Sequence, residues 1–177
     1  MSANVYFISD LHLSHRGMWK KEWSSRQGWI DSYETHDAHL HALYASQVRK
    51  KRDICWFLGD VSFTVKGLQY LETWPGRKIL VRGNHDRLNE SLYRQVFEKI
   101  YGIMMYKEFW LSHVPLHPSE LRFDRKVINV HGHLHDDLIY DQYNQVDRRY
   151  INVCVEKLEG VPIPLDELRA IAEERGL

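Results

Sequence analysis

The sequence predicts an α/β protein with buried sheets, because short apolar strand patterns alternate along the chain with amphipathic helical patterns. The clearest helical pattern covers residues 34–49, where Leu40, Leu43, Tyr44 and Val48 lie along one stripe. Strand patterns are short runs rich in β-branched and aromatic residues. They cover residues 4–9, 54–58, 78–82, 109–112, 127–130 and 150–155.

Two further helical patterns lie later in the chain. Asn89 stands where its side chain would cap a helix that carries Leu92, Val96 and Ile100. Residues 165–175 form the second pattern, and the glycine that follows stands in the place of a C-terminal cap. No internal repeat and no Pro/Ser-rich linker separates these elements.

Length and composition favour one globular, cytoplasmic domain over residues 1–177. The 24 basic and 24 acidic residues balance, so the chain has no overall field for a polyanion or a membrane surface, although this balance does not exclude nucleic acid. No apolar run approaches the roughly 18 residues of a membrane span. Cys55 and Cys154 lie inside apolar runs, which predicts buried thiols rather than a disulfide.

Nearly every predicted strand is followed at once by a small polar cluster. Side chains at strand ends are a common way to build a site, and these clusters contain the residue types that bind metals or transfer protons. They comprise Asp10, His12, Asp60, Asn84, His85, Asp86, His113, His133 and His135.

The donor types in these clusters indicate divalent metal ions. In an extended segment residues i and i+2 point the same way, so Asp10 and His12 are expected to address one point, as are His133 and His135. Carboxylate, imidazole and amide donors without thiolate suit manganese first, with iron, zinc or nickel as alternatives. Seven donors exceed the needs of one four-coordinate ion, but they suit two ions that share the Asp60 carboxylate.

Such a pair of ions favours the hydrolysis of phosphate esters. Two divalent ions bring four positive charges against two ligand carboxylates, so the pocket stays positive. A metal pair about 3.5–4 Å apart can clamp phosphate oxygens, and its bound water ionises near pH ~7, which supplies hydroxide for in-line attack.

The order of the motifs resembles that of the calcineurin-like metallophosphoesterase superfamily, over about residues 4–156. Segments 111–116, 129–135 and 152–156 are most similar to small stand-alone phosphoesterases of bacteria and their phages. The resemblance implies an αββα sandwich, in which two mixed β-sheets are flanked by helices. It also implies one ion held by Asp10, His12, Asp60 and His135, and a second held by Asp60, Asn84, His113 and His133.

Residues beside the metals are expected to have further roles, and the resemblance itself implies only that of His85. His85 would face the scissile phosphate and act as general acid. Asp86 would orient His85 or hold the loop. Arg82 would reach phosphate or form a structural ion pair, and Arg16 and His117 are further candidates for substrate contacts, with exposed loop residues as the alternative.

Two other groups invite a functional interpretation. The Trp-rich segment 19–29, which includes Arg26, is either a substrate lid or a loop packed onto the core. His36, His39 and His41 scatter around the predicted helix rather than pairing at i, i+4, so we expect them to be solvated.

The predicted activity is hydrolysis of a phosphodiester or phosphomonoester in a small, nucleotide-like molecule. Residues 61–64 lack the Asp-Arg pair of protein phosphatases, which disfavours that class. The alternatives are a nuclease on single-stranded or terminal nucleic acid, whose activity would fall steeply with salt, and a non-catalytic metal-binding protein.

Overall fold

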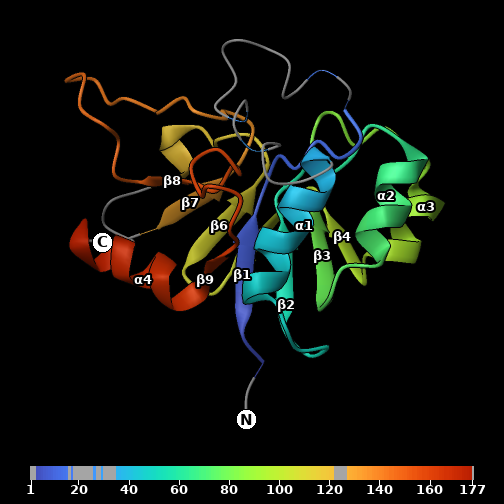
Figure 1. Cartoon of the computed structure of the whole chain (residues 1–177). Coiled ribbons are helices and arrows are strands. Elements are labelled where there is room, and N and C mark those ends of the chain that lie inside the picture. Colours follow the sequence, from blue (N-terminus) through green and yellow to red (C-terminus); the bar gives the residue numbers. More distant parts are fainter. Residues whose placement is uncertain are drawn as a thin grey trace.

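The computed structural model describes residues 3–15, 17, 26, 29, 35–121 and 127–176. Two β-sheets pack face to face (Figure 1). The first sheet has the order β4 (Lys99–Tyr101), β3 (Arg77–Val81), β2 (Ile54–Phe57), β1 (Val5–Ile8) and β9 (Ile163–Pro164). The second has the order β5 (Ile103–Tyr106), β6 (Phe109–Ser112), β7 (Ile128–His131) and β8 (Tyr150–Asn152). Only β9 and β5 run antiparallel to their neighbours, so both sheets are mixed, as predicted.

The period-2 alternation of the strands builds two separate cores. In β1, Phe7 points toward the second sheet and packs in one cluster with Leu111 and Val130. Its neighbours Tyr6 and Ile8 point the opposite way, into the cluster beneath the helices. A central strand with apolar residues on both faces is buried on both, which explains its continuous apolar sequence.

Helices cover the outer face of the first sheet and the end of the sandwich (Figure 1). The helices α1 (His36–Gln47), α2 (Val65–Glu72) and α3 (Glu90–Val96) pack on the first sheet through their buried apolar residues. The last helix, α4 (Leu165–Glu174), contacts β9 and β1 and places Leu168 in the core between the sheets.

The six predicted strands and three predicted helices are all present, with ends that differ by a few residues. The predicted helix after Asn89 is shorter than expected, because Phe97 adopts extended geometry and Ile100 lies in β4. Elements β4, β5, β9 and α2 had no clear pattern in the sequence. Helix α2 begins where the Thr64 side chain accepts a hydrogen bond from the Gly67 N–H.

The histidines of α1 differ from the prediction. His36 is fully buried, and His39 and His41 are half-buried rather than solvated. The His41 ring stacks on Trp74 and the His39 ring on Trp29, with centroids 5.2 and 5.7 Å apart. Helix α1 is therefore packed over more of its circumference than its apolar stripe indicates.

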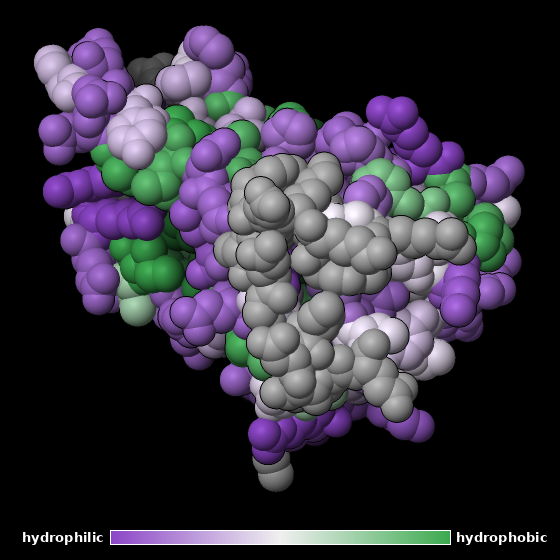
Figure 2. Space-filling view, turned by 45° about the horizontal axis from the view of Figure 1, so that its top comes forward, coloured by the Kyte–Doolittle hydropathy of each residue, from purple (hydrophilic) through white to green (hydrophobic). Residues whose placement is uncertain are grey.

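Cys55 and Cys154 are both buried free thiols, which confirms the prediction made from their apolar surroundings. Hydrophilic residues dominate the face shown in Figure 2, where hydrophobic residues form separate patches. Within the described residues, no helix is both long enough and apolar enough to cross a membrane.

Candidate metal centre

The polar clusters converge at one edge of the sandwich, because the parallel strands of both sheets end there. Backbone hydrogen bonds join the loops within each sheet, and the Ser9 N–H after β1 donates to the Val153 carbonyl after β8 at 2.9 Å, which joins the two sheets. The Asp10 N–H donates to the Gly59 carbonyl at 3.0 Å, and the Gly132 N–H donates to the His113 carbonyl at 2.9 Å. Residues far apart in the sequence are thereby held in a fixed relation.

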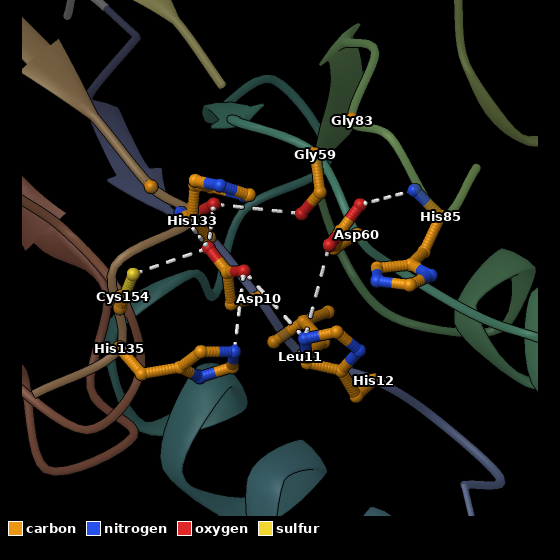
Figure 3. A network of polar contacts seen from close by, with 12 residues as sticks. Asp10, Leu11, His12, Gly59, Asp60, Gly83, His85, His133, His135 and Cys154 are labelled. Atoms are coloured by element: carbon orange, nitrogen blue, oxygen red, sulfur yellow. Dashed lines mark hydrogen bonds and ion pairs between the residues drawn. The ribbon is translucent and has the colours of Figure 1, made fainter. Parts of the chain in front are cut away.

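Two triads of potential metal ligands form within this edge, and Figure 3 labels all of their residues except His113. In each triad, one donor atom from every residue lies within 4.8 Å of the other two, which is close enough to surround one ion. The first triad is Asp10, His12 and His135, and the second is Asp60, His113 and His133.

The Asp10 carboxylate has one occupied and one open oxygen. Its Oδ2 accepts hydrogen bonds from Ser9 Oγ at 2.6 Å, the His133 N–H at 2.8 Å and Cys154 Sγ at 3.1 Å. Its Oδ1 is buried 3.5 Å from His12 Nε2, and within the described residues neither atom has a hydrogen-bond partner. Buried polar atoms without partners are costly. These two atoms therefore fit a cation that both would contact.

Asp60 lies between the two triads. Its Oδ2 is 3.4 Å from His113 Nε2 and 4.0 Å from His12 Nε2, so one oxygen faces a member of each triad. Its Oδ1 accepts the backbone N–H of His85 at 2.8 Å, which fixes the carboxylate plane. Asn84 Oδ1 lies 2.8 Å from His113 Nε2 and so adjoins the second triad.

The protonation of the histidines reflects burial and the two carboxylates. Burial lowers the pKa of His12, which keeps its ring neutral and able to bind a cation. Burial would also lower the pKa of His113, but the hydrogen bond to Asp60 and the charges of Asp10 and Asp60 raise it to about 9. The carboxylates thus create a field that attracts positive charge, either a proton on His113 or a metal ion.

The backbone turns these ligands inward through an uncommon conformation. The φ angles of Asp10, His12, Asp60, His133 and His135 are 59°, 49°, 52°, 72° and 52°. These values lie in the left-handed region, which costs an L-residue about 1–2 kcal/mol. The extended geometry assumed from the i, i+2 spacing is therefore wrong. The prediction that the side chains of His133 and His135 address one point is also wrong, because the two residues belong to different triads.

Two motif glycines allow the loops to approach closely. A Cβ on Gly59 would lie 2.5 Å from His113 Nδ1, and a Cβ on Gly83 would lie 2.3 Å from Asp60 Oδ1. Gly59 also has a φ of 93°. Any side chain at either position would displace a candidate ligand, which explains glycine there.

Comparison with known proteins agrees with this geometry. The sequence model of the calcineurin-like phosphoesterase family matches residues 3–162. The chain belongs to this family. The calcineurin-like phosphoesterases are metal-dependent hydrolases of phosphoester bonds, so this phosphoesterase is an enzyme of that class and acts on phosphorylated substrates.

Relatives of this phosphoesterase match it over almost their whole length. The Gene 66 protein of Mycobacterium phage L5 is 32% identical over 99% of each chain. The uncharacterized protein MJ1445 of Methanocaldococcus jannaschii is 31% identical over 96% of this chain and 92% of its own. The crystal structure of AQ665, a protein of unknown function from Aquifex aeolicus, superposes with a TM-score of 0.70 and 26% identity over 96% of this chain and all of its own.

His85 lies beside the first triad of the phosphoesterase site. Its backbone is tied to Asp60, and its half-buried ring lies 6.0 Å from the His12 ring, measured between centroids. Phe63 packs against both rings, 4.9 Å from His85 and 5.2 Å from His12. Phe63 was not among the predicted site residues, although an aromatic residue just after a ligand motif was a usable signal.

Asp86 holds loops together. Its buried carboxylate accepts the backbone N–H groups of Asp60 at 2.9 Å, Val61 at 3.0 Å and Gly83 at 2.8 Å. Burial raises its pKa to about 6 despite these donors. These contacts correspond to the loop-holding alternative in the sequence analysis rather than to an orienting contact with the His85 ring.

The three candidate substrate contacts fare differently. Arg82 donates to the carbonyls of Asp86 and Leu88 and so holds the loop, and no carboxylate pairs with it among the described residues. Its contact with phosphate stays a prediction. His117 is exposed and caps the short 3₁₀ helix η2 (Pro118–Glu120), where its Nδ1 contacts Ser119. Arg16 lies outside the described residues, as does most of segment 19–29.

Ser9, Cys154 and Glu156 had no predicted role, but they contact ligands of the first triad. Ser9 and Cys154 hydrogen-bond to Asp10, and Glu156 Oε1 lies 2.7 Å from His135 Nδ1. Arg26, grouped with the possible lid, is fully buried against this site. His131, which is in phase with the ligand histidines, contacts the Gly132 carbonyl at 2.8 Å, and burial lowers its pKa to about 4.

Proposed function

We propose that this phosphoesterase hydrolyses a phosphodiester bond in a small, nucleotide-like molecule with two divalent metal ions, of which Mn²⁺ is the first candidate. The observation that carries the proposal is the position of Asp60 Oδ2 between the two triads. A shared carboxylate favours two ions that act together over two independent sites. Asp10, His12 and His135 would hold one ion, and Asn84, His113 and His133 the other.

The charges around the triads suit a phosphate ligand. Asp10 and Asp60 supply two negative charges to the triads. Of the other nearby carboxylates, Glu156 is paired with Arg26 at 2.6 Å, and Asp86 accepts three backbone N–H groups. Two divalent ions would therefore leave the pocket positive. Bound ions would polarise the phosphate and lower the pKa of a water molecule toward ~7.

The protein's own part in the reaction falls to His85. Its ring is half-buried and packs against Phe63, next to His12 of the first triad. From that position a protonated imidazole would donate its proton to the leaving oxygen of the substrate, which is general acid catalysis. Asp86 keeps the two flanking loops in register, so that His85 and Asp60 hold their relative positions.

The surroundings favour a diester over a monoester. A monoester dianion carries an extra negative charge, and sites specialised for it commonly add guanidinium groups near the phosphate. Here the two arginines that flank the Gly-Asn-His-Asp motif are engaged elsewhere. Arg82 donates to the Asp86 carbonyl at 2.8 Å, and Arg87 to the Asn84 carbonyl at 2.8 Å.

The test compares two chromogenic substrates on one preparation. The kcat/KM values for bis-p-nitrophenyl phosphate and p-nitrophenyl phosphate are measured with Mn²⁺, at equal pH and ionic strength, with a chelator control. We expect the diester to be cleaved at least as well as the monoester, and chelation to abolish both activities. A clear preference for the monoester would contradict the substrate class. Activity that persists after complete metal removal would contradict the metal mechanism.

A second comparison separates small substrates from polymers. A dinucleotide and a single-stranded oligonucleotide are offered at 50 and 200 mM salt. We expect cleavage of the dinucleotide with little salt dependence, since the chain has no net charge. Preferred cleavage of the oligonucleotide, falling steeply with salt, would instead establish the nuclease alternative.

A further inference from the structure

Arg26 occupies an unusual place for an arginine. Its side chain is fully buried, although long charged side chains are seldom buried without partners. It lies against the loop that carries Asp10 and His12, within hydrogen-bond distance of two of its carbonyls. The contacts of its guanidinium group show which parts of the site it stabilises.

Arg26 closes the backbone turn that presents the first triad. Its Nη2 donates to the Asp10 carbonyl at 2.6 Å, and its Nη1 donates to the Leu11 carbonyl at 3.0 Å. Asp10 and His12 flank this turn with left-handed φ angles. A backbone in this conformation persists only where its surroundings hold it there. The two donated hydrogen bonds satisfy buried carbonyls and oppose relaxation of the turn.

The same guanidinium holds the third member of the triad through Glu156. Arg26 Nε and Nη2 lie 2.8 and 2.6 Å from Glu156 Oε1, which also accepts from His135 Nδ1 at 2.7 Å. Because a carboxylate only accepts hydrogen bonds, His135 carries its proton on Nδ1. Its Nε2, 4.0 Å from Asp10 Oδ1, is then the atom left to bind a metal.

A buried histidine extends the network to the far end of the turn. Arginine has no acceptor atom, so His36 Nε2, 3.1 Å from Arg26 Nη1, accepts, and His36 Nδ1 donates to Asp37 Oδ1 at 3.2 Å. Asp37 Oδ2 in turn accepts from the N–H and hydroxyl of Ser14, at 2.9 and 3.1 Å. One continuous chain of hydrogen bonds therefore supports the backbone from Asp10 to Ser14.

We propose that Arg26 is a positioning residue for the Asp10–His12–His135 triad, and that it acts through the turn carbonyls and through Glu156. The proposal rests on the proposed function only in that this triad binds an ion. The second triad contains no residue that Arg26 contacts in the described structure. Loss of Arg26 should therefore weaken one metal site selectively.

The experiment measures metal binding rather than hydrolysis. Mn²⁺ is titrated into the metal-free full-length chain by calorimetry, for wild type, Arg26→Met and Arg26→Lys. We expect wild type to bind two ions, and Arg26→Met to bind one of them about 10–100-fold more weakly, the usual effect of removing a partner of a ligand. Arg26→Lys should recover part of that affinity, because it keeps the charge but not the fork of donors.

The matched control is Arg149→Met. Arg149 also pairs with one carboxylate, that of Asp147 at 2.6 Å, and also donates to two carbonyls, those of Pro118 and Leu121 at 3.3 Å. It has no contact with either triad in the described structure. This variant should bind both ions as wild type does, even if its Tm falls.

If Arg26→Met does not fold, the double variant Arg26→Met/Glu156→Leu still tests the proposal. Removing both partners leaves no buried charge unpaired, so the double variant should fold more readily than the single. It should still lose affinity at one site. Wild-type affinity for two ions in either folded variant would overturn the proposal. Failure of the wild-type protein itself to bind any ion would instead overturn the proposed function.

Discussion

Gly132 is the residue where one added methyl group should damage the site most directly. Its φ lies outside the left-handed region, so the backbone itself would accept alanine. The Cβ, however, would lie 2.0 Å from Ser9 Oγ and 2.4 Å from Asp10 Oδ2. An ordinary contact between carbon and oxygen is about 3.3 Å, so both side chains would have to move by roughly 1 Å.

The structure sets the expected size of the effect. Overpacking of this kind costs about 1–3 kcal/mol, and for a chain of this length each kcal/mol lowers Tm by about 2–4 °C. A shift of 1 Å also exceeds the roughly 0.5 Å tolerance of a metal site. We therefore expect Gly132→Ala to lower the Tm of the metal-free protein by several degrees and to lose Mn²⁺ affinity at the first triad.

The assay combines thermal unfolding of the metal-free protein with an Mn²⁺ titration. Gly102→Ala is the matched control, because a Cβ at Gly102 would meet nothing within 4 Å. That variant should keep wild-type Tm and metal binding. If Gly132→Ala behaved like Gly102→Ala in both measurements, the close packing around Asp10 would not have the importance assigned to it.

Three further predictions concern the metals and the acid. Asp60→Asn should lower occupancy at both metal positions, which elemental analysis would test; two tightly held ions in this variant would remove Asp60 as the bridge. His85→Ala should keep its ions but lose about 10²–10⁴-fold in kcat on a diester with a poor leaving group, and unchanged turnover there would exclude it as the acid. Mn²⁺ at 100 times its Kd should stabilise the protein by about 2.7 kcal/mol per site. Thermal unfolding with and without a chelator measures this effect, and equal Tm values would contradict it.

The sequence predicted the fold because its central strands are buried on both faces. Runs such as residues 54–58 are apolar throughout. Such a run can be recognised as a strand from the local sequence alone, without knowing which strands pair with it. The strand β5 alternates between exposed and half-buried residues at a sheet edge, and β9 has only two residues, so neither left a recognisable pattern. Tertiary pairing rather than local preference defines such strands.

The candidate site was predictable for the same reason in part. Residues that directly follow buried strands in the sequence must lie at the ends of those strands. The sequence therefore predicted that Asp10, Asp60 and His113 lie together. The supporting residues were less accessible, because their roles depend on contacts across the chain. Arg26 and Glu156 are 130 positions apart, and nothing local distinguishes a buried arginine from a solvated one.

The two triads have one property that bears on the mechanics of the fold. Each draws ligands from both sheets: Asp10 and Asp60 follow strands of the first sheet, whereas His113 and His135 follow strands of the second. Bound ions would thus act as cross-links between the sheets at the edge where their hydrophobic contact ends. Amide hydrogen exchange at this edge should slow when metal is added, while the opposite end of the sandwich exchanges at its former rate. Bound metal ions would then also stabilise the packing of the two sheets against each other.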